Sequence, residues 1–400
     1  MKKTTKHGSP GSRSANDTIV ISRRLAIYRN LSSAVFPERA PPEEAKAVGG
    51  KIAAACEDYL REIGGGPLVR IAHGEPGWSE RLAVYTHLHD GDPERTKYDS
   101  VVFLEGRGLP DIIVNSSDHV EISFEHVNND FGEAAAEAGK IADELGKRLN
   151  FANCDPFGWL SADPDHAGAG MRISQSFCFG ALLILRELDA VLRGVERIGF
   201  DVVPVFGDTS PEAMHNELAP GACYRISPLP NDGMDGPALA TKAERVFRAL
   251  VEIEKNARLA LNADFISREL LTDYVMRAIG IGAGARLTSE TEYIDVNVAL
   301  AFGVDMGVIR EARPPEERKN LGAFFRDSVA LFAVQTIMAQ KTSLDEDDSD
   351  FTRKCFLANM TRHDFRRYVP EWLEHTGDKF LERFDSRMYE TKSEAKKKKR

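Results

Sequence analysis

Residues 171–179 constrain the fold of this chain most strongly, because polar and apolar side chains alternate there with the period of a β-strand. One face of the strand would carry Arg172, Ser174, Ser176 and Cys178, and the other face would carry Ile173, Phe177 and Phe179. The residues before it read as a short strand and a loop of Gly and Ala, which allows an anion to approach the backbone. Two interpretations stay open: a strand that holds an arginine beside an anion site, and a polar edge strand after an ordinary turn.

Length and composition set the broad class. A chain of 400 residues, 42% of them hydrophobic, is long enough for about two folded domains. The net charge of -10 argues against a general nucleic-acid or anionic-membrane binder, since such proteins present positive charge to phosphate. The five cysteines are odd in number and widely spaced, which predicts neither a disulfide framework nor a zinc site and favours a reducing, cytoplasmic setting. The N-terminus lacks the apolar run of a secretion signal, and no apolar run of about 18 residues indicates a membrane span.

The pattern along the chain predicts an α+β fold, in which an antiparallel sheet flanked by helices is followed by an α-helical C-terminal domain. Short strands separated by Gly and Pro turns dominate the first half, and residues 131–149 form an amphipathic helix that would cover one face of the sheet. The predicted divisions are a disordered basic tail (1–16), the sheet domain (17–256), a helical domain (257–340), a helical extension (341–388) and a basic tail (389–400).

Some local patterns have two explanations each. His87 at the end of a strand is a structural histidine or a functional one, and Asp118 with His119 is an acid–base pair or an ordinary turn. The glycines of residues 280–284 lack the preceding strand of a dinucleotide fingerprint, so they favour the end of a helix and a turn. Ser289 followed by Glu292 is a capping box that predicts the start of a helix.

Four segments together resemble the ATP:guanidino phosphotransferase family, which includes arginine and creatine kinases, and within it most closely the bacterial protein-arginine kinases. Val20–Leu31 resembles the family segment that runs from serine and arginine to Arg-Asn-Leu, and residues 115–122 resemble its Asn-Glu-Glu-Asp-His block. Residues 157–174 resemble the most specific block, Gly-(Tyr/Phe)-Leu…Cys-Pro-Thr-Asn-x-Gly-x-x-(Leu/Met)-Arg-Ala-Ser. Gly303–Ile309 is similar to Gly-Val-Asp-Leu-Gly-Leu-Ile in the bacterial enzymes, so the likeness spans roughly residues 19–340.

The resemblance implies MgATP and an arginine guanidinium as ligands. Arginines would clamp the phosphates, Mg²⁺ would be bound through the phosphates without a protein ligand, and a carboxylate would align the acceptor. The nucleotide-binding residues implied in this way are Ser22, Arg24, His87, Arg172, Ser174 and Ser176. The carboxylates that would act on the guanidinium are Asp118, Asp163 and Asp208. The expected partners are therefore ATP and arginine or an arginine-bearing protein, with no nucleic acid and no membrane, and a homodimer is left open.

Several family positions are substituted. Three phosphate-facing arginines of the family fall at Ala26, Glu121 and Val203. The acceptor carboxylate and its neighbour fall at Ser117 and Ser116, and the reactive cysteine falls at Asp163. A clamp group of this kind is worth about 3 kcal/mol, or about two powers of ten in rate.

Two hypotheses follow from this pattern. The first is a divergent protein-arginine or guanidino kinase with reduced or lost activity. The second is a pseudokinase that keeps the fold and acts as a partner-binding or regulatory module.

Overall fold

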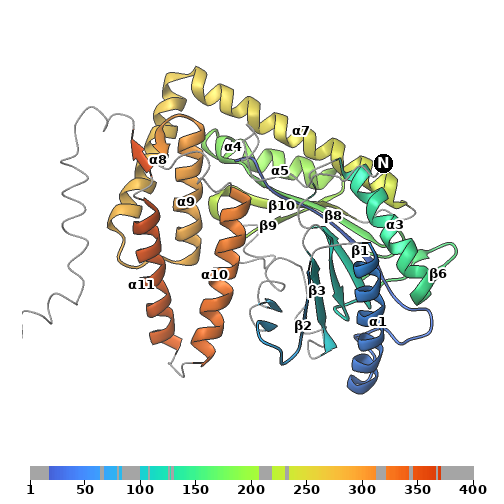
Figure 1. Cartoon of the computed structure of the whole chain (residues 1–400). Helices are drawn as coiled ribbons and strands as arrows, with labels where there is room; N and C mark the ends of the chain where they lie inside the picture. Colours follow the sequence, from blue (N-terminus) through green and yellow to red (C-terminus); the bar gives the residue numbers. More distant parts are fainter. Residues whose placement is uncertain are drawn as a thin grey trace, which may run out of the picture.

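An eight-stranded sheet lies at the centre of the molecule (Figure 1). The computed structural model describes residues 18–63, 67–78, 81–82, 100–106, 109–124, 127, 130–206, 219–229, 234–311, 321–341, 346–365 and 368–370. In this sheet the strand order is β2-β3-β4-β5-β1-β8-β10-β9, and every neighbouring pair is antiparallel. The strands are β1 (Val20–Arg29), β2 (Leu68–Ala72), β3 (Val102–Gly106), β4 (Asp111–Val114), β5 (Val120–Phe124), β8 (Met171–Cys178), β9 (Phe200–Pro204) and β10 (Cys223–Pro228). Residues 171–179 therefore form a strand inside the sheet, and the edge-strand interpretation is wrong.

One face of the sheet is apolar and packs against helices. Leu25, Ile27, Ile122 and Ile173 alternate with polar residues along their strands, and all four are fully buried in the main hydrophobic core. The covering helices lie on this side of the sheet (Figure 1), where α3 contacts α7 and β1, and α5 contacts β9. These helices are α1 (Pro42–Glu62), α3 (Phe131–Leu149), α4 (Gly180–Ile184), α5 (Leu188–Arg197) and α7 (Gly236–Ala263). A 3₁₀ turn, η2 (Pro220–Ala222), and a small hairpin of β6 (Asn153–Cys154) and β7 (Gly158–Trp159) complete this part.

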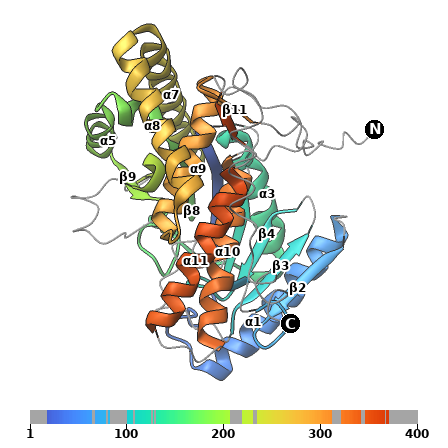
Figure 2. The ribbon, with the colours of Figure 1, turned by 90° about the vertical axis from the view of Figure 1, so that its left-hand side faces the viewer.

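The C-terminal part is helical. It contains α8 (Phe265–Gly284), α9 (Glu290–Asp305), α10 (Leu321–Lys341) and α11 (Glu346–Phe365). These helices stand together at one end of the sheet in both views (Figure 2). The Ser289 hydroxyl caps α9 by accepting a hydrogen bond from the backbone N–H of Glu292 at 3.1 Å, so the predicted helix start is confirmed. Residues 280–284 are the last turn of α8, which agrees with the helix-end interpretation.

Two expectations about this part can be compared with the structure. The domain boundary predicted at residue 256 lies inside α7, which continues to Ala263, and the division into domains stays a prediction. The helical extension predicted for residues 341–388 is helical through α11 to Phe365, but Tyr368–Pro370 forms β12, which pairs with β11 (Ile309–Glu311). Residues 371–388 lie outside the described residues. Pro370 explains the change, because proline cannot donate a helical hydrogen bond and biases the residue before it toward extended backbone.

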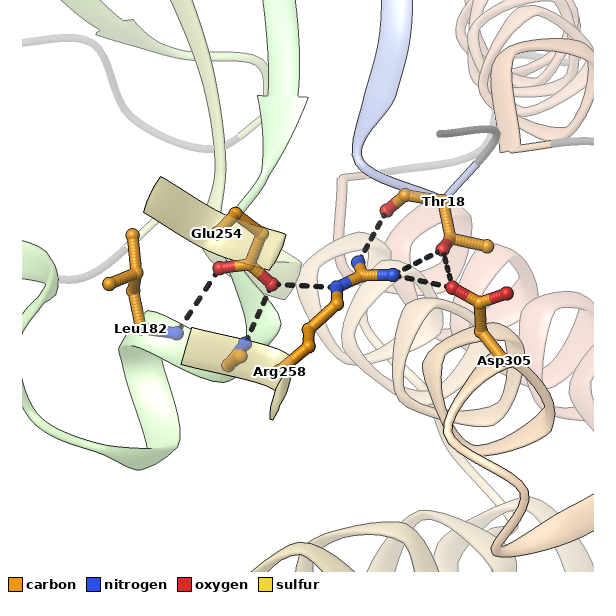
Figure 3. A network of polar contacts seen from close by, with 6 residues as sticks. Thr18, Leu182, Glu254, Arg258 and Asp305 are labelled. Carbon is orange, nitrogen blue, oxygen red and sulfur yellow. Dashed lines mark hydrogen bonds and ion pairs between the residues drawn. The ribbon is translucent and has the colours of Figure 1, made fainter. Parts of the chain in front are cut away.

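A buried ion network ties the helical part to the start of β1 (Figure 3). On α7, Arg258 Nε pairs with Glu254 at 3.0 Å, and its Nη1 contacts the Thr18 hydroxyl at 2.8 Å and the Asp305 carboxylate of α9. Glu254 is fully buried and accepts hydrogen bonds from the first backbone N–H groups of α4, those of Ala181 at 2.9 Å and Leu182 at 3.2 Å. Burial raises the pKa of Glu254, and the Arg258 charge and these hydrogen bonds oppose that shift. One arginine thus joins α7, α9 and the strand that carries Arg24.

The cysteine pattern was misjudged from the sequence. Cys178 and Cys223 are joined by a disulfide at directly opposed positions of β8 and β10. Both are buried in a second apolar cluster with Tyr293, Val298 and other side chains of α9, α10 and α11. Cysteine spacing along the chain gave no sign of this bond, because the two residues become neighbours only through strand pairing.

The sequence prediction of an α+β fold, with helices flanking an antiparallel sheet and a helical C-terminal part, is confirmed. Among the described helices, none is long and apolar enough to cross a membrane.

Candidate nucleotide-binding face of the sheet

The second face of the sheet is polar, and strand register gathers predicted site residues on it. Ser22 lies opposite Ser176, Arg24 lies opposite Ser174, and Arg172 lies opposite Ala26. Side chains of directly opposed residues point to the same side of an antiparallel pair, with Cβ atoms about 5 Å apart. Five of the six residues predicted to bind nucleotide therefore share one side of β1 and β8, which we call the polar face. The polar face also carries Glu121 and Ser123 of β5 and Arg225 and Ser227 of β10.

The side chain of Arg24 is paired with a carboxylate of the protein itself. Its guanidinium forms an ion pair with Glu121, and its Nε donates to the Ser123 hydroxyl at 3.2 Å. The Arg24 and Glu121 side chains are only 10% and 2% exposed. Glu121 stands where the resemblance expects an arginine, so the substitution places a carboxylate beside Arg24. A phosphate that approached Arg24 would have to displace that carboxylate.

The loop before β8 holds its shape through Arg29. The Nη1 atom of Arg29 donates to the carbonyl oxygens of Tyr28 at 2.7 Å and Gly170 at 2.9 Å, and its guanidinium lies 4.0 Å over the Trp159 ring. Gly170 has a φ of 57°, and a Cβ at this position would come within 2.8 Å of Trp159 Cβ. The Gly and Ala content predicted that an anion could come close to the backbone of this loop. At Gly170 the group that comes close to the backbone is the guanidinium of Arg29, a cation of the chain itself.

His166, a residue that motif reasoning passed over, lies inside this loop and is 6% exposed. Its imidazole ring stacks on the Tyr28 ring of the polar face, with centroids 3.9 Å apart and planes 6° apart. Neither ring nitrogen has a hydrogen-bond partner among the described residues. Desolvation by burial lowers the pKa of His166 to about 4, although the Asp163 carboxylate opposes that shift, so the ring is neutral at pH 7. The sequence signal that could have identified His166 was its position in the run Asp163-Pro164-Asp165-His166, which lies inside the most specific family motif.

Asp118 connects two loops beside the polar face. Its side chain is fully buried and accepts hydrogen bonds from the Ser161 hydroxyl at 2.7 Å, from the Ala162 backbone N–H at 2.8 Å and from the Asn30 amide. Burial raises the pKa of Asp118, and these three hydrogen bonds oppose the shift. The contacts are those of a residue that positions the 161–163 loop, and direct action of Asp118 on an acceptor stays a prediction.

Asp163 is the more accessible of the two described candidate carboxylates. It is half-buried in the loop before β8, and its Oδ1 accepts a hydrogen bond from the Asp165 backbone N–H at 2.9 Å. The negative charge of Asp163 opposes the lowering of the His166 pKa. A carboxylate and a neutral imidazole therefore lie near each other in this loop. Two further predicted residues, His87 and Asp208, lie outside the described residues.

A small cavity of about 40 Å³ opens where β8 begins and β10 ends. Its polar lining comes from Asp165, His166, Arg172, Asp201 and Ser227. Arginine and hydroxyl groups on the polar face suit phosphate oxygens, which accept hydrogen bonds. Among the described residues, no group of three or more His, Cys, Asp or Glu side chains is placed so that it could hold a metal ion.

Comparison with known proteins defines the class. A model of the C-terminal catalytic domain of ATP:guanido phosphotransferases matches residues 70–257. Residues 70–257 therefore correspond to the catalytic domain of the ATP:guanido phosphotransferase family, and the sequence relatives below support the same family. The members of that family are transferases that use ATP.

Its relatives include bacterial protein-arginine kinases. The protein-arginine kinase of Bacillus pumilus is 25% identical over 293 residues, which cover 73% of this chain and 78% of that protein. The protein-arginine kinase of Symbiobacterium thermophilum is 27% identical over 297 residues, which cover 73% of this chain and 80% of that protein. Among solved structures, the duplicated taurocyamine kinase of Schistosoma mansoni aligns with a TM-score of 0.47 and 17% identity, covering 63% of this chain and 35% of that one.

Proposed function

We propose that this chain is an ATP:guanidino phosphotransferase that transfers the γ-phosphoryl group of MgATP to an arginine guanidinium at a reduced rate. The observation that supports the proposal is the gathering of Arg24, Arg172, Ser174 and Ser176 on one polar face, beside the loop that carries Asp163. In this reaction the bond from phosphorus to the ADP oxygen breaks, and a bond from phosphorus to a guanidinium nitrogen forms. The proton released by that nitrogen would pass to a carboxylate, for which Asp163 is the candidate.

The chain's own residues bind and orient the reactants. Arg172 donates hydrogen bonds to phosphate oxygens, and the Ser174 and Ser176 hydroxyls lie beside it along β8. Bound Mg²⁺ would neutralise charge on the phosphates. Arg24 contributes only when Glu121 gives way, which is the physical reason to expect a reduced rate.

The same ion pair favours a second candidate, a pseudokinase that binds a partner through the retained fold. Arg24 already has an anionic partner in Glu121, so the pair would be stable in the protein without nucleotide. Such a protein would act as a regulatory or binding module in place of an enzyme.

One pair of measurements separates the two candidates. Titration calorimetry with MgATP measures nucleotide binding, and incubation with labelled ATP and an arginine-rich protein measures acid-labile phosphoramidate. Under the proposed function, the wild type binds MgATP and forms product, while Arg172→Gln forms at least tenfold less. Arg193→Gln is the matched control, because Arg193 is an exposed residue of α5 that pairs with Asp189. A wild type that binds no MgATP and forms no product at high protein concentration would contradict the transferase and support the pseudokinase. MgATP binding that Arg172→Gln abolishes would count against the pseudokinase.

A further inference from the structure

Arg225 is a cation on the polar face that no sequence motif identified. It lies on β10, directly opposite Ser176 of β8 on one side and directly opposite Val203 of β9 on the other. On β10 the apolar residues Tyr224 and Ile226 point to the core, so Arg225 and Ser227 point to the polar face. The register therefore puts Arg225 in one row with Val203 and Ser176.

Val203 is the position at which the family resemblance expects a phosphate-binding arginine. A valine side chain has no donor for a phosphate oxygen. Because opposed residues on neighbouring antiparallel strands have Cβ atoms about 5 Å apart and point the same way, an arginine at 225 occupies the neighbouring place on the same face. The long side chain of Arg225 can then reach the same phosphate group from the neighbouring strand.

Burial divides the polar face into two halves. Over β1 and β5, the side chains of Arg24, Glu121 and Ser123 are buried and bonded to one another. Over β8, β10 and β9, by contrast, Arg172, Arg225, Val203 and Asp201 each keep partial exposure, while Ser174, Ser176 and Ser227 beside them are buried. The described charges on this second half are two arginines and the Asp201 carboxylate, and Asp201 lies at the start of β9 opposite Ser227. The accessible half is thus the more cationic one.

We propose that Arg225 binds the phosphate groups of the nucleotide in place of the arginine missing at Val203, so that the phosphate site is centred on β8 and β10. Arg172 and Arg225 then form the cationic pair of this site. The Ser174 and Ser176 hydroxyls lie on β8, where Ser174 is two residues from Arg172 and Ser176 is directly opposite Arg225. This inference rests on the proposed use of MgATP, but it concerns the place of the phosphates and not the acceptor.

The test is a set of calorimetric titrations with MgATP and with adenosine. Arg225→Gln removes the charge and keeps a polar side chain, and we expect at least a tenfold loss of MgATP affinity with no change in adenosine affinity. A residue that only supports the fold would affect both ligands, whereas a phosphate-binding residue affects the one that carries phosphates. Arg193→Gln on helix α5, which covers the other face of the sheet, serves again as the matched arginine control and should bind both ligands as the wild type does.

A transposed variant makes the test sharper. The double substitution Val203→Arg with Arg225→Gln returns the cation to β9, and we expect its MgATP affinity to recover to within about threefold of the wild type. Thermal unfolding of each variant checks that the sheet is intact. Unchanged MgATP affinity in Arg225→Gln, equal losses for adenosine and MgATP, or no recovery in the transposed variant would each overturn the inference while the proposed function stands. If the wild type binds no MgATP, the proposed function fails and this inference fails with it.

Discussion

Replacing Glu121 by glutamine should weaken the fold and strengthen nucleotide binding at the same time. Glu121 and Arg24 form an ion pair whose side chains are 2% and 10% exposed. Removing one partner of a buried pair costs about 3–5 kcal/mol, because the other charge stays buried without compensation. Glutamine keeps an oxygen that accepts a hydrogen bond from Arg24, so we expect a loss nearer to about 2 kcal/mol in the free energy of unfolding.

Much of the stability that Glu121→Gln loses should be recovered when MgATP binds. A phosphate oxygen on Arg24 restores an anionic partner, so much of the free energy lost by the free protein is recovered in the complex. A recovery of about 2 kcal/mol corresponds to about a thirtyfold gain in MgATP affinity, since each 1.4 kcal/mol is tenfold. Urea denaturation measures the first effect, and calorimetric titration measures the second.

The matched control lies on the opposite side of β1. Glu244 of α7 pairs with Arg23 at 2.7 Å, and Arg23 points to the helix-covered face. Glu244→Gln should therefore lower stability and leave MgATP affinity unchanged. If folded Glu121→Gln binds MgATP within about threefold of the wild type, Arg24 does not contact the nucleotide and this reasoning is refuted.

Two further predictions concern stability. Because burial lowers the pKa of His166 to about 4 from an ordinary value near 6.5, the unfolded chain binds more protons than the folded protein between these values, and stability should fall as the pH drops from about 6.5 to 4. The loss from this group approaches roughly 3 kcal/mol, and urea denaturation across that pH range should show a shallower pH dependence for His166→Asn; an identical slope would contradict the assignment. Arg258→Met leaves the buried Glu254 carboxylate without its cation and should cost about 3 kcal/mol in urea denaturation, with partial recovery when Glu254→Gln is added. A loss below about 1 kcal/mol would show that the network contributes little.

Local pattern predicted much of the sheet. The alternation from Arg172 to Cys178 fixed which side chains share a face, because period-two alternation is a property of a single strand. The capping box at Ser289 marked a helix start for the same reason, since its hydrogen bond spans only three residues. Features of this kind depend on neighbours along the chain and can be read before the fold is known.

The remaining features depend on register between distant segments. The Arg24–Glu121 pair, the Cys178–Cys223 disulfide and the row that contains Arg225 all join residues on different strands. A shift of one residue in any pairing would turn each of these side chains to the other face. Sequence alone predicted that Arg24 on β1 and Arg172 on β8 bind phosphate, but it could not say that Arg24 would pair with a carboxylate.

The opposition of Arg225 and Val203 has a consequence for how relatives of this protein are compared. Compared position by position with the family pattern, the valine at 203 and the arginine at 225 look like two unrelated features. In the sheet the two positions are separated by one interstrand spacing of about 4.8 Å, so under the proposal above they amount to one cation moved to the neighbouring strand. Inheritance of a binding surface can therefore be tracked on the face of a sheet even where no single alignment column preserves it.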